Sequence, residues 1–312
     1  MRDSTSHIAD VYDRARRRVA RVRHDGLAPD VPAEHLAQFA RSHRPYLTVA
    51  FRCERLTPET IGVLNANSEL GCVNVYTDSP FVIPGNSAVR MFDSLREYRA
   101  VLTFAKSLLG SFRQLGARHV AWLPFGYHPA LNRPTSDAGK HAQWDVTFAG
   151  TWGPLQERWL ERLLDLDLRI FGRQWHHLSR GSQLRARWRH GQGLGSEMAE
   201  VIGAARVTVN FVRAEHGCAH SMKTFEIPAS GGFMLTNDTE EQRLFFQGDE
   251  ECVYFDSPEE MAAKAKFYIS HHHERARIRL AGMRAVAPHT YLARAKGLLR
   301  FLERGDAPFT TG

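Results

Sequence analysis

Residues 221–237 read SMKTFEIPASGGFMLTN, a stretch that joins a helical pattern to two glycines and an apolar strand. Lys223 and Glu226 stand three residues apart, so on a helix their side chains share one face. Gly231 and Gly232 follow, although a single left-handed residue is enough to end a helix. We therefore expect the second glycine to let the backbone approach another group closely, such as a bound ligand.

The composition limits the class of protein. The chain has 312 residues, which exceeds the usual size of one hydrophobic core, so two domains are expected. Forty-one basic residues against 34 acidic ones give a net charge of +7, which favours anionic ligands such as phosphates, nucleotides or nucleic acid. Only six of the basic residues are lysines, so the lysine at position 223 is an unusual choice.

The four cysteines are scattered and form no C-x-x-C pair. This pattern favours neither a disulfide framework nor a structural zinc site, and it is typical of a reducing cytoplasm. No run approaches the roughly 18 to 20 apolar residues of a membrane span. Residues 1–18 also lack the apolar core of a secretory signal. We therefore expect a soluble, cytoplasmic protein.

Short apolar strands alternate with helical patterns from residue 46 onward, as is typical of a parallel α/β sheet. Only helical patterns precede that point, where a Rossmann-like half normally opens with a strand. In the first half we expect strands at 46–51, 73–78, 100–104 and 119–125, with helices at 57–67, 88–98 and 107–116.

A segment rich in Pro, Asn, Ser, Asp and Gly, residues 128–143, is expected to be a linker. A second alternation of strands and helices follows it. We expect strands at 144–150, 168–172, 205–211, 232–236 and 252–255, helices near 154–165, 196–204 and 221–230, and purely helical structure over the last sixty residues.

Ligands of an open parallel sheet bind beyond the carboxyl ends of its strands. The stretch FAGTWGP (148–154) lies at such an end: a strand runs into Gly150, Thr151 and Trp152, and Pro154 is favoured as a first helical residue. Backbone amides ahead of a helix suit phosphate, which makes these three residues candidate phosphate contacts. A glycine turn between strand and helix is also common without any ligand.

The opening stretch lies at another carboxyl end. We expect Ser221 to cap its helix and Pro228 to remove one helical hydrogen bond. A Glu226 carboxylate that accepts two ribose hydroxyls and a Lys223 ammonium that meets a diphosphate would explain why the two stand together. The alternative is an ordinary surface ion pair.

Two further sets of polar residues are candidates for chemistry. His216 and His220 have the spacing of metal ligands on a helix, but Gly217 and the absence of a helical pattern argue against a metal site, so we expect a loop there. Asp78 follows a strand of the first half directly, so its carboxylate is a candidate general base at that edge of the sheet. An aspartate before Ser-Pro is also typical of a simple turn.

The run MKTFEIPASGGFMLT follows a strand that ends at Asn210 and precedes CVYFDSPEEMAAKAKFYI (252–269) and HTYLARAKGLL (289–299). Together these segments resemble the C-terminal half of the CgeB-like glycosyltransferases, relatives of the GT-B enzymes of family 4. FAGTWGP, RIFGRQW (169–175) and VNVYTDSPF (73–81) are similar to other strands of that family. The resemblance covers roughly residues 45–300.

The resemblance implies a GT-B fold, in which two Rossmann-like domains face a cleft, with a helical C-terminal tail. The implied parts are an acceptor domain over residues 1–130, shortened at its start, a nucleotide-sugar donor domain over 140–290, and a tail over 291–312 that packs back on the first domain.

Carried over to this sequence, the resemblance places Glu226 on the ribose. Lys223 takes the place of a basic residue, often arginine, near the diphosphate and would act in catalysis with Asp78. The other implied contacts of the donor site are Gly150, Thr151, Trp152, Asn210, His216, His220, Gly231 and Gly232. The related retaining enzymes carry a second glutamate where this chain has Cys218, so the sugar and the stereochemistry stay open.

The sequence thus predicts a glycosyltransferase that moves a glycosyl group, such as a hexosyl group, from a UDP-, GDP- or dTDP-linked donor, with neither a metal ion nor a cofactor. The acceptor stays open between a glycan, a protein, a small molecule and a nucleic acid. One alternative is a sugar-nucleotide epimerase of the same architecture, which needs no acceptor site. The other is a nucleotide-sugar-binding protein without activity, suggested by Cys218 and the short first half.

Overall fold

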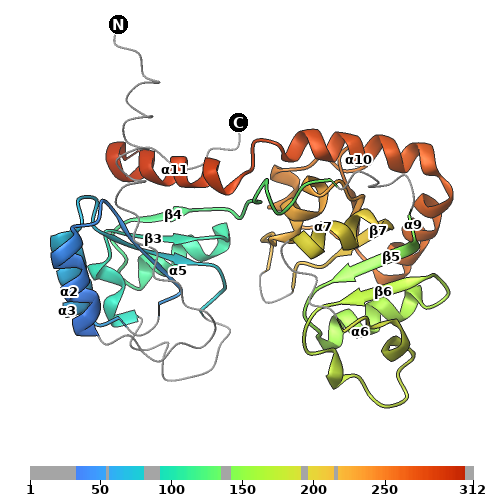
Figure 1. Cartoon of the computed structure of the whole chain (residues 1–312), viewed down its shortest axis with the longest axis horizontal. Helices are drawn as coiled ribbons and strands as arrows, with labels where there is room; N and C mark the ends of the chain where they lie inside the picture. Colours follow the sequence, from blue (N-terminus) through green and yellow to red (C-terminus); the bar gives the residue numbers. More distant parts are fainter. Residues whose placement is uncertain are drawn as a thin grey trace, which may run out of the picture. The chain divides into compact units, whose positions relative to one another are not determined.

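The computed structural model describes residues 33–53, 56–80, 92–134, 142–190, 196–213 and 217–305. The chain forms two compact units, Met1–Leu123 with Arg300–Pro308 and Pro124–Leu299 with Phe309–Gly312 (Figure 1). His216, the beginning of the helix expected at 88–98 and the middle of the linker expected at 128–143 lie outside the described residues.

The first unit is built on a parallel sheet with the strand order β1-β2-β3-β4. Its strands are β1 (Thr48–Phe51), β2 (Cys72–Tyr76), β3 (Ala100–Thr103) and β4 (Val120–Trp122). Its helices include α2 (Ala33–His43), α3 (Pro58–Asn67) and α5 (Leu109–Gln114), and α2 lies beside α3 (Figure 1).

Local sequence signals explain how α3 begins. The Thr57 hydroxyl accepts a hydrogen bond from the Thr60 N–H at 3.3 Å, and Pro58 occupies the first helical position, where its missing N–H has no cost. The apolar side chains of α3 then pack into a core with β2 and α5, in which Ile61 and Phe112 are fully buried.

The second unit is built on a parallel sheet with the strand order β6-β5-β7-β8-β9. Its strands are β5 (Trp144–Ala149), β6 (Leu168–Phe171), β7 (Ala205–Asn210), β8 (Met234–Asn237) and β9 (Val253–Phe255). The next strand after β6 returns to the other side of β5, so a topological switch point lies between β5 and β7. Crevices at such points are where α/β sheets bind ligands.

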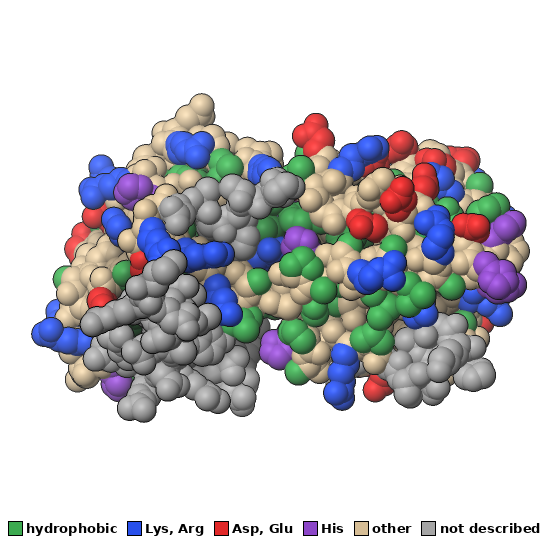
Figure 2. Space-filling view, turned by 90° about the horizontal axis from the view of Figure 1, so that it is seen from above, with side chains coloured by type: hydrophobic (Ala, Val, Ile, Leu, Met, Phe, Trp, Pro, Cys, Tyr) green, Lys and Arg blue, Asp and Glu red, His purple; other side chains and the backbone are tan. Residues whose placement is uncertain are grey.

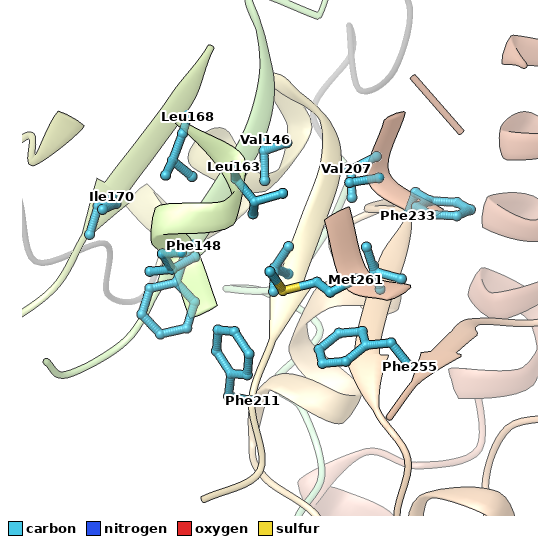
Figure 3. Close-up of a cluster of buried hydrophobic side chains, with 14 of the residues drawn as sticks. Val146, Phe148, Leu163, Leu168, Ile170, Val207, Phe211, Phe233, Phe255 and Met261 are labelled. Atoms are coloured by element: carbon cyan, nitrogen blue, oxygen red, sulfur yellow. The ribbon is translucent and has the colours of Figure 1, made fainter. Parts of the chain in front are cut away.

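Helices cover this second sheet and continue to the C-terminal region. They are α6 (Pro154–Leu160), α7 (Ser196–Gly203), α8 (Lys223–Ala229), α9 (Pro258–Ser270), α10 (His272–Val286) and α11 (Tyr291–Arg304). In the core, Phe148 of β5 and Phe255 of β9 meet Phe211, which follows β7, and Met261 of α9 (Figure 3). Burial of these apolar side chains is the main force that holds the sheet and α9 together.

The structure confirms the α/β fold with parallel sheets and a helical C-terminal region. All nine expected strands are present in the expected order. The strand expected at 119–125 ends at Trp122, close to Pro124, which has no N–H to offer a sheet ladder.

The surface of the second unit carries charges of both signs. Figure 2 shows basic and acidic side chains interspersed with apolar ones on the face that it presents. Within the described residues, no helix has the length and apolar character that crossing a membrane requires.

Candidate functional site

Helix α8 contains the lysine and the glutamate of the opening stretch, and it starts two residues later than expected. Ser221 does not cap it: its hydroxyl donates instead to Oδ1 of Asn210 at 3.2 Å. The N–H groups of Phe225 and Glu226 donate to the carbonyl of Met222. The hydrogen bond of Ser221 to Asn210 therefore joins the residues just before α8 to the carboxyl end of β7.

Lys223 and Glu226 form a partly buried ion pair on this turn. Nζ of Lys223 lies 2.6 Å from Oε2 of Glu226, and the two side chains are 23% and 13% exposed. Within the described residues, Oε1 of Glu226 forms no hydrogen bond. Burial and then the Glu226 carboxylate raise the pKa of Tyr291 to about 12, so this phenol stands near the pair as a neutral group.

A buried polar network fixes α8 against the ends of β7 and β8. Oε1 of Gln242 accepts hydrogen bonds from the hydroxyls of Thr224 (2.9 Å) and Thr236 (3.1 Å) and from Nδ2 of Asn210 (3.4 Å). These four side chains are at most 3% exposed. Asn210 was expected to touch the donor, but its amide is committed to bonds inside the protein, so in this structure it positions α8.

The two glycines have structural roles, and the expected ligand contact at Gly231 and Gly232 does not fit the geometry. Gly231 has φ 77° and ends α8, with its N–H bonded to the carbonyl of Pro228 and that of Gly232 to the carbonyl of Ile227. A Cβ on Gly232 would lie 2.4 Å from Cγ2 of Ile202. The close approach predicted from the second glycine is real, but the neighbour is a buried side chain of α7.

The loop after β5 offers fewer free amides than expected. The N–H of Gly150 donates to the carbonyl of Phe171 at 2.9 Å, and that of Trp152 donates to the carbonyl of Arg173 at 3.0 Å. Among the described residues these two amides are therefore occupied, whereas the Thr151 N–H forms no hydrogen bond. Of the three candidate phosphate contacts, only Thr151 keeps an available backbone donor.

His220 is fully buried and has no nitrogen left for a ligand. Its Nε2 accepts the N–H of Phe125 at 3.0 Å, so the proton lies on Nδ1, which is 2.7 Å from Oε2 of Glu241. The expected role of His220 in lining the sugar and diphosphate does not fit this arrangement. Within the described residues, no group of three or more His, Cys, Asp or Glu side chains is placed to hold a metal ion.

Asp78 lies in the first unit, two residues beyond the end of β2. Its Oδ2 is 2.8 Å from Nη1 of Arg52, and the side chains of Arg52 and Asp78 are 38% and 45% exposed. Its position after β2 places the carboxylate at the carboxyl edge of the sheet, where we expect a base. The same carboxylate forms an exposed ion pair with Arg52.

Gln242, Thr224 and Tyr291 were not singled out from the sequence. Gln242 stands in a polar stretch, TNDTEEQRL (236–244), where nothing marks one side chain as buried. Thr224 lies between Lys223 and Glu226 on α8, and its helical position alone would place it on another face of the helix. Tyr291 is the first residue of the amphipathic helix α11 and is 37% exposed.

Comparison with known proteins places the chain among glycosyltransferase folds. A family model described as "Glycosyl transferase-like" matches residues 154–300. The crystal structure of Anabaena Alr3699/HepE in complex with UDP-glucose is similar with a TM-score of 0.64 and 14% identity, over 86% of this chain and 81% of that one. No curated protein sequence matches the chain.

Two further solved structures have the same fold. A glycosyltransferase from Rickettsia africae ESF-5 gives a TM-score of 0.61 at 12% identity, over 97% of this chain and 89% of that one. Sucrose-phosphate synthase from Thermosynechococcus elongatus gives 0.58 at 15% identity, over 88% and 78%. The chain thus has the GT-B fold of these proteins.

Proposed function

We propose that this protein is a glycosyltransferase that moves a sugar from a nucleotide-diphosphate donor to a hydroxyl group of an acceptor, with the donor bound by the second unit. Support comes from the glycosyltransferase-like model, which matches much of that unit, and from the similar structures of Anabaena Alr3699/HepE in complex with UDP and with UDP-glucose. A cytoplasmic location belongs to the same proposal.

The observation that carries this proposal is the pair of Lys223 and Glu226. Both side chains are mostly buried, yet Oε1 of Glu226 has no hydrogen bond within the described residues. A carboxylate with one open oxygen is suited to accept ribose hydroxyls, and charge-assisted bonds of this kind are strong. The ammonium group beside it would meet the diphosphate.

Catalysis would rest on stabilisation of the leaving diphosphate. Lys223 and the free N–H of Thr151 are the donors that we assign to it, because preformed donors aimed at developing charge supply a large part of many rate enhancements. In this proposal neither a metal ion nor a cofactor takes part.

The finer parts of the proposal follow from the sequence resemblance. We assign the chain to the CgeB-like group and expect transfer of a hexosyl group from a UDP-, GDP- or dTDP-linked donor. Asp78 is the proposed base for the acceptor hydroxyl if the reaction inverts, and its exposed pair with Arg52 can open to a substrate.

A nucleotide-sugar-binding protein without transfer activity is the second candidate. It is favoured by Cys218, which stands where related retaining enzymes have a glutamate that touches the sugar. Binding of nucleotide sugars without turnover in the presence of any acceptor would support it.

A thermal-shift panel tests the donor site. UDP, GDP, dTDP and their glucose conjugates are compared with free glucose, each with and without EDTA. We expect at least one nucleotide diphosphate to raise the Tm by an amount that grows with its concentration, since a ligand at about 100 times its Kd stabilises the folded state by about 2.7 kcal/mol. Free glucose should have no effect. A flat response to every nucleotide would refute the proposal.

A further inference from the structure

A cluster of buried rings fixes α8 through the residue next to Glu226. The ring centroid of Phe225 lies 4.9 Å from that of Phe245 and 5.5 Å from those of His220 and His289. Phe225 is fully buried, and the two side chains assigned to the donor flank it in the sequence. Any ordering of α8 by a ligand therefore acts directly on this cluster.

The same cluster holds the segment by which the chain enters the second unit. Phe125 is the second residue after the boundary at Leu123, and both of its main-chain groups are bonded by buried side chains. Its N–H donates to Nε2 of His220 at 3.0 Å, and its carbonyl accepts from Nε of Arg294 at 2.9 Å. Arg294 also places a guanidinium nitrogen 3.0 Å from Nδ1 of His289.

The loop that carries His220 is itself fixed. Glu241, which accepts from Nδ1 of His220, donates its own N–H to the carbonyl of Cys218 at 3.0 Å. The Thr239 hydroxyl donates to the carbonyl of Ala219 at 2.7 Å. The imidazole therefore has little freedom to move without moving either α8 or the Phe125 peptide.

Within the second unit, residues 126–127 lie against residues 289–291. Tyr127 donates its N–H to the carbonyl of His289 at 3.1 Å, and the Tyr291 N–H donates to the carbonyl of Tyr127 at 3.0 Å. Gly126 allows this approach, because a Cβ there would lie 2.7 Å from the His289 carbonyl oxygen. Residues 124–127 and the beginning of α11 are thus joined backbone to backbone within the second unit.

We propose that this cluster is a relay: a nucleotide diphosphate bound at Lys223 and Glu226 stiffens residues 124–127 through the hydrogen bond between His220 and the Phe125 N–H. The inference rests on the proposed donor site. A ligand that restricts the remaining motion of α8 also restricts Phe225, and the packed rings pass that restriction to an imidazole bonded to residues 124–127. His220 is a positioning residue in this scheme, and the coupling acts equally in both directions.

Two substitutions separate the two bonds of His220. In His220→Gln the amide lies as far from the backbone as Nε2, so its oxygen can accept from the Phe125 N–H, but no donor is left at the position of Nδ1 beside Glu241. In His220→Asn the shorter side chain places its amide nitrogen at the position of Nδ1, where it can donate to Glu241, and no acceptor reaches the position of Nε2. Both variants lose the imidazole ring and its packing. A difference between the two therefore reports on the hydrogen bonds and not on the lost packing.

The readout is hydrogen exchange at the Tyr127 amide, whose bond to His289 neither substitution touches. The Val101 amide, bonded to the His119 carbonyl in the first unit, is the control for global unfolding. The probe is UDP, or GDP or dTDP if either gives the larger thermal shift, and calorimetry measures its binding to each variant separately.

We expect the nucleotide to slow exchange at Tyr127 about fivefold more than at Val101 in the wild type and in His220→Gln. In His220→Asn the nucleotide should still bind, and this extra slowing should disappear. Binding without extra slowing in the wild type overturns the relay, and that result needs no variant. Equal slowing in both variants, or its loss in both, also overturns it. No binding to the wild type by calorimetry overturns the donor site itself.

Discussion

The carboxyl ends of the two sheets hold their polar side chains in different ways. In the second unit, Asn210, Thr236 and Gln242 are buried and bonded to one another beneath α8. In the first unit, Asp78 and Arg52 form an ion pair whose side chains are 45% and 38% exposed. Satisfied buried networks rigidify a site, whereas exposed pairs contribute little and rearrange easily. The second edge is thus preorganised and the first is adaptable.

The largest effect is expected from breaking the buried network. Gln242→Ala removes the acceptor shared by Thr224, Thr236 and Asn210 and leaves a cavity, so we expect the second unit to lose about 3 to 5 kcal/mol of unfolding free energy. Urea unfolding followed by tryptophan fluorescence checks this, because only Trp122 of the six tryptophans lies in the first unit. An unchanged midpoint would show that the network does not hold this edge.

The next effect is a pH dependence that arises at His289 in the second unit. Burial, followed by the charge of Arg294, lowers the pKa of His289 to about 4, from a usual value of 6.5. The unfolded chain therefore takes up the proton first as the pH falls. The contribution of neutral His289 is complete above pH 6.5 and is lost between 6.5 and about 4.

Measurement between pH 6.5 and 5 avoids most carboxylate titrations. We expect the unfolding free energy of the wild type to fall by about 1 to 1.5 kcal/mol over this range, and that of His289→Gln to fall much less. Equal slopes for the two proteins would contradict the role given to His289.

A smaller effect is expected at the close contact beneath α8. Gly232→Ala places a Cβ 2.4 Å from Cγ2 of Ile202, and relief of this overlap should cost about 1 to 3 kcal/mol. Gly62→Ala on the exposed side of α3 is the matched control in the first unit, since no atom lies within 4 Å of the position that its Cβ would take. It should gain about 0.5 to 1 kcal/mol from helix propensity. Similar unfolding free energies for the two variants would show that the contact at Gly232 is no more restrictive than the open space at Gly62.

The smallest effect is expected at the exposed edge of the first sheet. Asp78→Asn breaks the pair with Arg52, and its unfolding free energy should change by no more than about 1 kcal/mol. Thermal unfolding monitored by calorimetry checks this. A loss comparable with that of Gln242→Ala would mean that this edge is also a structural centre.

The sequence predicted the fold well because its evidence is periodic and repeated. Apolar strands such as 100–104 and 205–211 are bounded by turns and helices, and each independently indicates a buried parallel strand. The pairing of Lys223 with Glu226 was predicted for a similar reason, since helix geometry alone brings residues three apart together.

The other site residues could not be predicted because their partners are distant in the chain. The second glycine of 231–232 indicated a close approach, but only the structure shows that the neighbour is Ile202 and not a ligand. Likewise, the bonds of His220 to Phe125 and of Gly150 to Phe171 join residues that no local pattern relates. A sequence pattern indicates that a position is constrained, and the fold decides what constrains it.

The most direct test of the donor site is the affinity of Glu226→Gln for a nucleotide diphosphate. The substitution keeps the shape of the side chain and removes the charge that would accept ribose hydroxyls beside Lys223. We expect calorimetric titration with UDP, or with the nucleotide that gives the largest thermal shift, to show a Kd about 10 to 100 times that of the wild type. This corresponds to the loss of charge-assisted bonds of about 1.5 to 3 kcal/mol, with a nearly unchanged Tm. Equal dissociation constants for the two proteins would contradict the donor site and leave Lys223 and Glu226 as a structural ion pair.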